Sequence, residues 1–197
     1  MDHLQKLEAL IKKQNGTVLS SDLDKLSIPR IYLAKLVKEK KLERVSWGIY
    51  TQLDTIEDEM YILQKKYKKF IFSHETALFL HDLSDRTPLK YCVTVPSGTK
   101  ISKKLSDRLK IYYIKGEYHI LGVIETQTAL GNPIKIYNSE RTICDILRSK
   151  SRIDQQIFSD ALKRFGRSKQ IDFYLLSDYS NKFKGERTLR TYIELIL

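Results

Sequence analysis

The most informative part of the sequence is residues 27–50, which read SIPRIYLAKLVKEKKLERVSWGIY. Pro29 fits the first turn of a helix, where its missing N–H removes no hydrogen bond. We expect Ser27 to cap this helix and the helix to end near Lys41. Residues 42–51 then predict a β-hairpin, because strand-forming residues lie on both sides of a glycine. The stretch therefore predicts a helix followed by a two-stranded hairpin.

Two shorter helices are expected before this stretch. Leu4, Leu7 and Ile11 follow the spacing of an amphipathic helix, and Gly16 lies just past its end, where a left-handed residue is expected. After a short extended segment, Ser21-Asp22-Leu23-Asp24 resembles the capping box of a second helix. Three helices and a hairpin in this order are typical of a winged helix-turn-helix, whose third helix enters the major groove.

The third predicted helix has two different faces. A projection at about 100° per residue places Leu33, Leu36 and Val37 toward the core, and Ile28, Ile31, Lys35 and Lys38 on the opposite face. Lysines can reach phosphates or guanine, and isoleucine can contact a thymine methyl group. The residues expected to bind double-stranded DNA are Lys25, Arg30, Ile31, Lys35, Lys38, Arg44 and Trp47. Trp47 is expected either on the sugar-phosphate backbone or folded back onto the third helix.

The net charge supports a polyanionic partner. The chain carries 35 Lys and Arg against 24 Asp and Glu, a net +11, which is typical of nucleic-acid binding, although lysines that only maintain solubility are the alternative. Residues 1–52 hold ten basic and six acidic residues, a net +4, so residues 53–197 carry the remaining +7. The excess is therefore not confined to the predicted DNA-binding domain.

Residues 53–197 predict a second domain. Short apolar segments typical of strands occur between residues 70 and 137, and helical patterns dominate from Ser139 onward. The predicted fold class is α+β, with an N-terminal winged helix-turn-helix over residues 1–52. A mixed α/β domain with a helical C-terminal half follows over residues 53–197, and its length is sufficient for a core of its own.

Motifs of catalysis and metal binding are missing from the sequence. It has no glycine-rich phosphate loop and no serine nucleophile elbow. Cys92 and Cys144 are too few and too far apart for a zinc cluster, and His74 and His81 lack a third ligand nearby. Apolar runs are far shorter than the roughly 20 residues of a membrane span. We therefore expect a cytoplasmic protein that is not an enzyme, needs no cofactor or metal, and does not contact membranes.

A basic face is expected on the helical half of the second domain. In the helix predicted to end at Phe165, Lys163 and Arg167 project close together, with Arg164 beside them if the helix continues. This face would either extend the DNA footprint or engage an acidic or nucleic-acid partner. A purely solvated surface is the alternative.

Four stretches together resemble the AbiEi-like antitoxins of bacterial abortive-infection systems, which are type IV toxin–antitoxin systems of phage defence. They are Trp47-Gly48-Ile49-Tyr50, residues 72–78 (FSHETAL), residues 92–96 (CVTVP) and residues 136–145 (IYNSERTICD). The resemblance covers nearly the whole chain in the right order. One departure is Lys40-Lys41, where the family often has a glycine before the wing.

The resemblance implies an antitoxin that is also a transcriptional autorepressor. Such proteins bind inverted repeats in their own promoter and neutralise a co-encoded nucleotidyltransferase-like toxin without requiring a stable complex. Neutralisation in the family is attributed to the C-terminal domain. We expect a monomer in solution with two copies on DNA. A ligand-sensing winged-helix regulator without a toxin partner is the alternative, and an enzyme anchored by a winged helix is a third, less favoured one.

Overall fold

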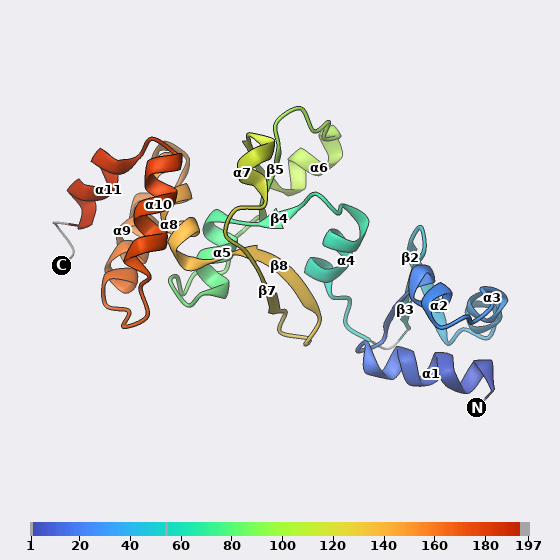
Figure 1. The fold of residues 1–197 in the computed structure, drawn as a ribbon. Helices are drawn as coiled ribbons and strands as arrows, with labels where there is room; N and C mark the ends of the chain where they lie inside the picture. The colour runs from blue at the N-terminus through green and yellow to red at the C-terminus, as the bar shows by residue number, and fades with distance from the viewer. Residues whose placement is uncertain (1, 54, 194–197) are drawn as a thin grey trace. The chain divides into compact units, whose positions relative to one another are not determined.

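The computed structural model describes residues 2–53 and 55–193, and its mixture of helices and sheets confirms the predicted α+β class (Figure 1). The chain forms two compact units. One comprises Met1–Lys68 and Thr126–Ile134, and the other Lys69–Glu125 and Lys135–Leu197. The N-terminal unit thus extends past the boundary predicted after residue 52. None of the helices in the described ranges combines the length and apolar composition that a membrane crossing requires.

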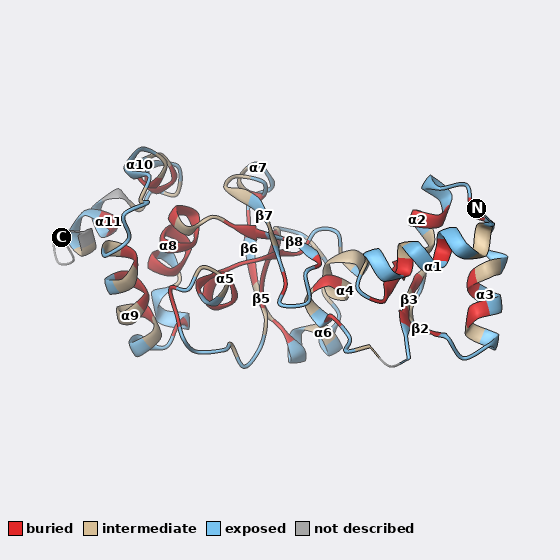
Figure 2. Cartoon of the chain, turned by 90° about the horizontal axis from the view of Figure 1, so that it is seen from below, coloured by how far each residue is buried: buried red, intermediate tan, exposed pale blue. Residues whose placement is uncertain are grey.

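The N-terminal unit begins with a winged helix-turn-helix, as predicted. Its elements are α1 (His3–Lys13), β1 (Thr17–Leu19), α2 (Ser20–Lys25), α3 (Ile31–Lys38), β2 (Leu42–Ser46) and β3 (Ile49–Gln52). β3 lies between β1 and β2 and is antiparallel to both. The helices pack through buried leucines, among them Leu7, Leu23, Leu33 and Leu36, which Figure 2 shows as the red faces of α1, α2 and α3. This core fixes the orientation of α3 against the hairpin.

Among the helices that the structure describes, five end in the same backbone arrangement, the Schellman motif. In each, a residue with φ between 50° and 56° follows the C-cap, and the next N–H donates to a carbonyl five residues back. The left-handed residues are Asn15 after α1, Ser27 after α2, Lys40 after α3, Asp82 after α5 (His74–Leu80) and Lys184 after α10 (Phe173–Lys182). Glycine is the usual residue at this position, and none of the five is glycine. Each therefore carries some local strain.

The Schellman motif after α2 explains two wrong predictions. Ser27 does not cap α3, because it closes α2 instead, and Ile28 N–H donates to Leu23 O at 2.9 Å. Pro29 also disfavours a helical conformation at Ile28. Ile28 is buried rather than placed on the exposed face, and α3 begins at Ile31 with Arg30 at the N-cap position. The helix ends at Lys38, three residues before the predicted end.

A mixed five-stranded sheet has the strand order β6-β5-β4-β8-β7. The strands are β4 (Ile71–Phe72), β5 (Cys92–Pro96), β6 (Lys110–Ile114), β7 (Val123–Gln127) and β8 (Pro133–Tyr137). β4 is antiparallel to β5 and parallel to β8, and β5 is parallel to β6. All five lie close to segments predicted as strands.

The helical C-terminal half is also confirmed. It comprises α8 (Ser139–Arg148), a short 3₁₀ turn (Lys150–Arg152), α9 (Gln155–Gly166), α10 and α11 (Glu186–Ile193). Apolar side chains of α5, α8, α9, α10 and α11 form one core, including Leu78, Ile146, Phe158 and Leu176. The sequence predicts a last helix over residues 187–197, of which residues 194–197 lie outside the described residues. Three further helices are α4 (Glu59–Lys66), α6 (Lys103–Arg108) and α7 (Gly116–His119).

Candidate nucleic-acid interface

α3 presents an exposed face of one isoleucine and two lysines. Leu33 and Leu36 turn toward the core, whereas Ile31, Lys35 and Lys38 are on the exposed side of the helix. The side chain of Ile31 is 72% exposed, and Lys35 and Lys38 are exposed as well. Within the described part of the chain, no carboxylate pairs with either lysine. Lysines without a carboxylate partner can bind the phosphates of DNA, and an exposed isoleucine can contact a thymine methyl group. A major groove offers both kinds of group, so this face is suited to it.

Two of the predicted DNA-binding cations already have carboxylate partners. Arg30 donates from Nε and Nη2 to Asp24 at 3.0 and 2.6 Å, and the same hydrogen bonds hold the pKa of Asp24 below its usual value. Lys25 Nζ lies 3.1 Å from Asp22 Oδ1. Both pairs bridge residues at or beside the α2–α3 turn. Arg30 is thereby oriented at the beginning of α3, next to the exposed face.

The hairpin tip carries the most exposed aromatic side chain of the N-terminal unit. Trp47 is 89% exposed, so it does not fold back onto α3, which was one of the two expectations. The Arg44 guanidinium lies 4.6 Å from the Trp47 ring centroid, and its Nε donates to Ser46 O at 3.3 Å. Gly48 has φ +69°, and a Cβ there would lie 2.7 Å from Ser20 Oγ, so the turn requires glycine. The tip therefore holds a planar cationic and aromatic pair in solvent.

The comparisons with known proteins bear on this N-terminal part. Residues 5–51 match the family model described as "Transcriptional regulator, AbiEi antitoxin". The AbiEi resemblance is confirmed for these residues, which include one of the four stretches that carry it. The matched segment contains most of α1, all of α2 and α3, and nearly all of the hairpin, and therefore every residue predicted to bind DNA.

The other comparisons add little to the AbiEi match. Among solved structures, the RV2827C protein from Mycobacterium tuberculosis is similar with a TM-score of 0.48 and 10% identity, over 95% of this chain and 78% of that chain. A search of curated proteins finds no match.

The predicted basic face on the C-terminal unit divides into two parts. Arg164 forms an ion pair with Asp85 and donates to Asp82 O at 3.4 Å. Lys163 and Arg167 instead line a groove of about 430 Å³. The helical projection of the sequence placed Arg164 beside Lys163 and Arg167. It could not show that Arg164 pairs with Asp85, which lies about eighty residues earlier in the chain.

A buried polar cluster beneath β5 was not predicted from the sequence. The His74 ring stacks on Tyr112 with centroids 3.3 Å apart, and its nitrogens lie 3.0 Å from Ser73 Oγ and 3.2 Å from Ser149 Oγ. Burial, together with nearby Arg148, lowers the pKa of His74 well below its usual value. His74 also has φ 47°, a strained conformation for a non-glycine residue. The described residues contain no group of three His, Cys, Asp or Glu that could hold a metal.

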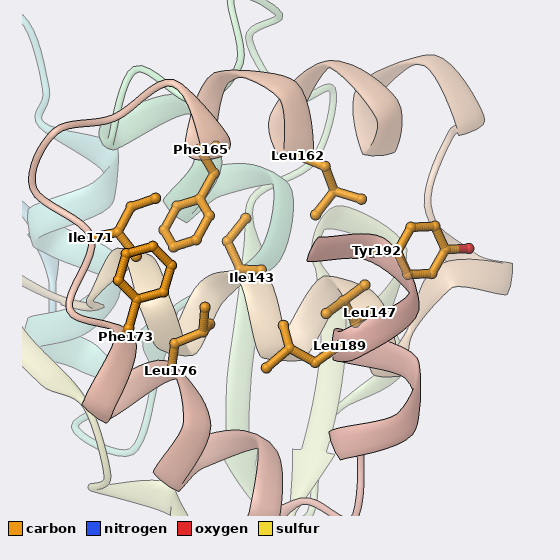
Figure 3. A pocket seen from close by; sticks show the side chains of 10 residues that line it. Ile143, Leu147, Leu162, Phe165, Ile171, Phe173, Leu176, Leu189 and Tyr192 are labelled. Atoms are coloured by element: carbon orange, nitrogen blue, oxygen red, sulfur yellow. The ribbon is translucent and has the colours of Figure 1, made fainter. Parts of the chain in front are cut away.

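The helical core contains a small, partly open apolar pocket, shown in Figure 3. It has a volume of about 20 Å³, and α8, α9, α10 and α11 contribute its lining, including Ile143, Phe165, Leu176 and Leu189. A cavity of this size holds about one water molecule, and an apolar one stays dry. It is therefore a packing defect rather than a ligand site.

Proposed function

We propose that the chain is a DNA-binding autorepressor that recognises inverted repeats in its own promoter, with one winged helix on each half-site. The observation that carries this proposal is the exposed α3 face of Ile31, Lys35 and Lys38, together with the exposed hairpin tip. The AbiEi match over residues 5–51 supports it, because that family is one of transcriptional regulators. A monomer in solution would place two copies on the two repeats.

The same proposal assigns toxin neutralisation to residues 53–197, through the basic pair Lys163 and Arg167. The partner would be a co-encoded nucleotidyltransferase-like toxin, opposed without a stable complex. The charge of +7 on residues 53–197 supports a polyanionic contact. We infer a regulatory rather than a catalytic role for the chain, in line with its family.

The test measures repression and neutralisation separately. Purified protein should protect two inverted half-sites of its own promoter, and scrambling either repeat should abolish the protection. The Lys163→Glu/Arg167→Glu variant should repress a promoter fusion normally and fail to rescue cells that express the neighbouring toxin. Uniform binding to all DNA sequences would contradict the repressor assignment. Full rescue by this variant would contradict the assignment of the pair.

The alternative, a ligand-sensing regulator without a toxin, is favoured by one observation. The groove beside α9 combines cationic, aromatic and polar side chains, as small-molecule sites do. A neighbouring reading frame that is toxic alone and harmless with this chain would exclude the alternative.

A further inference from the structure

The groove that contains Lys163 and Arg167 has a distinctive lining. Its residues come from α9, α11 and the 3₁₀ turn, and they are Lys150, Gln155, Phe158, Ser159, Leu162, Lys163, Arg167 and Tyr192. Three are cations, two are aromatic, and among these lining residues there is no carboxylate. The volume of about 430 Å³ is within the usual range of small-ligand sites.

We propose that this groove binds a nucleoside phosphate, either free or at the end of a single nucleic-acid strand. The phosphates lie against Lys163 and Arg167, and the nucleoside lies along Tyr192. The inference rests in part on the function proposed above, since it supplies a ligand for the basic pair assigned there to neutralisation. The ligand class that Lys163 and Arg167 would recognise is a nucleoside phosphate.

The charge pattern around α9 indicates an anion from outside the chain. Lys163 and Arg167 are four residues apart, so they lie on one face of the helix and repel each other. The position at the end of α9 offsets part of this repulsion, because a helix C-terminus favours positive charge. Within the described ranges neither has a carboxylate partner, whereas neighbouring Arg164 pairs with Asp85. Of the three cations that line the groove, Lys150 donates to Tyr192, which leaves Lys163 and Arg167 available to a ligand.

The opposite wall of the groove offers a fixed aromatic ring. Tyr192 packs edge-to-face on Phe158 with centroids 5.3 Å apart, and Lys150 Nζ donates to Tyr192 Oη at 2.6 Å. Phe158 is buried, whereas Tyr192 is half-buried and keeps part of its surface in the groove. A ring held in this way can stack against a base at little entropic cost, and such stacking tolerates every base.

Polar side chains at the far end of the groove complete the site. Gln155 and Ser159 lie on the same face of α9 as Lys163, at intervals of four residues. An amide and a hydroxyl supply both donors and acceptors, which ribose hydroxyls and base edges require. The face therefore has neutral hydrogen-bonding groups at one end and two cations at the other. This order is complementary to a nucleoside phosphate, which has a neutral nucleoside at one end and anionic phosphates at the other. A flat polyanion surface such as duplex DNA would make no use of the aromatic wall.

The test uses the full chain and isothermal titration calorimetry. The probes are the four ribonucleoside triphosphates, inorganic tripolyphosphate, and a short single-stranded oligonucleotide with a 5′-phosphate. We expect at least one nucleoside triphosphate or the oligonucleotide to bind more tightly than tripolyphosphate. The variant Lys163→Gln/Arg167→Gln should weaken that binding by about tenfold or more, and Tyr192→Leu should weaken it while leaving tripolyphosphate unaffected.

A matched control separates the site from general charge. Lys103→Gln/Lys104→Gln removes two exposed lysines of α6 and should change nucleotide affinity less than about twofold. Thermal melts verify that each variant folds, with Tyr192→Met as a second variant without an aromatic ring if Tyr192→Leu is unstable. Oligonucleotide binding without binding of any free triphosphate would identify a strand end as the ligand.

Three results would overturn the inference. They are no binding of any probe at millimolar concentration, equal affinity for tripolyphosphate and nucleotides, and an equal loss in the α6 control. Promoter binding is measured on the same samples. If the unmodified chain binds a nucleotide but does not recognise its promoter, the autorepressor proposal alone is refuted. If the unmodified chain recognises its promoter but binds no nucleotide, the nucleotide site alone is refuted.

Discussion

The Arg44 guanidinium lies over the Trp47 indole ring, 4.6 Å from its centroid, at the tip of the β2–β3 hairpin. Both side chains are exposed. Cation–π contacts at exposed sites contribute about 0.5–1 kcal/mol, so the pair adds little to the free energy of unfolding. Its exposure to solvent instead favours a role in contacting DNA.

Trp47→Ala should weaken promoter binding by about tenfold while changing the free energy of unfolding by less than about 0.5 kcal/mol. The reason is that Trp47 is 89% exposed and contacts almost no core. Gel-shift titration and urea denaturation measure the two effects. Leu89→Ala, which removes another fully exposed apolar side chain, is the control and should affect neither. A large loss of stability in Trp47→Ala would mean that the ring is a packing residue.

Lys35→Ala and Lys38→Ala should each weaken promoter binding. If a lysine contacts only phosphate, the loss should be equal for all sequences, and the slope of log affinity against log salt should fall by about 1 per lysine. Titrations at several salt concentrations measure this. Lys6→Ala on α1 is the control. Unchanged binding by the double α3 variant would remove this helix from the groove.

Asp24→Asn should increase the affinity for DNA of any sequence. The carboxylate lies next to the exposed α3 face and holds Arg30 by two hydrogen bonds, so its removal lowers repulsion and frees a guanidinium. Binding to promoter and random duplexes can be compared. Weaker binding to the promoter alone would show that Asp24 positions Arg30 for specific recognition.

Lys40→Gly should stabilise the protein by about 1 kcal/mol. Lys40 has φ 56° at the end of α3, a conformation that costs non-glycine residues roughly 1–2 kcal/mol, and part of the gain is lost to chain entropy. Chemical denaturation gives the value. Lys41→Gly, at a residue without positive φ, should destabilise instead. Equal effects of both changes would show that Lys40 is not strained.

Stability should fall as the pH drops below the usual pKa of histidine, about 6.5. Burial lowers the pKa of His74 in the folded state, so the unfolded chain binds more protons in this range. The free energy of unfolding then decreases by up to about 1.4 kcal/mol per pH unit. His74→Asn, which tolerates a left-handed backbone, should reduce this dependence, and His119, whose pKa burial also lowers, should account for the part that remains. An unchanged slope in His74→Asn would assign the effect to other groups.

The sequence was sufficient for the order of helices and strands and for the α3 face, because these depend on local periodicity. Ile31, Lys35 and Lys38 were placed correctly by their spacing alone. Ile28 was placed wrongly, because the same serine can open one helix or close the previous one, and only the bond from Ile28 to Leu23 distinguishes the two. α6 and α7 were not predicted, since six and four residues are too short for a periodic pattern.

The candidate sites were less predictable than the fold. The sequence could not show that Arg164 is paired while Lys163 and Arg167 face the groove, because its partner Asp85 is distant in the sequence. The groove could not be foreseen either, since Lys150 and Tyr192 reach it from other segments. Contacts that join residues far apart in the chain leave no local pattern.

The N-terminal unit is not a continuous piece of the sequence. Asn15 donates to Leu130 O at 2.6 Å, and Asp58 accepts hydrogen bonds from Thr128 and Asn132. A gene fusion that exchanged only the first 52 residues for another winged helix would leave residues 126–134 against a foreign surface. Recombination between relatives should therefore succeed mainly where the donor supplies both segments. New operator specificities would then arise more readily by substitutions on α3 than by exchange of the whole module.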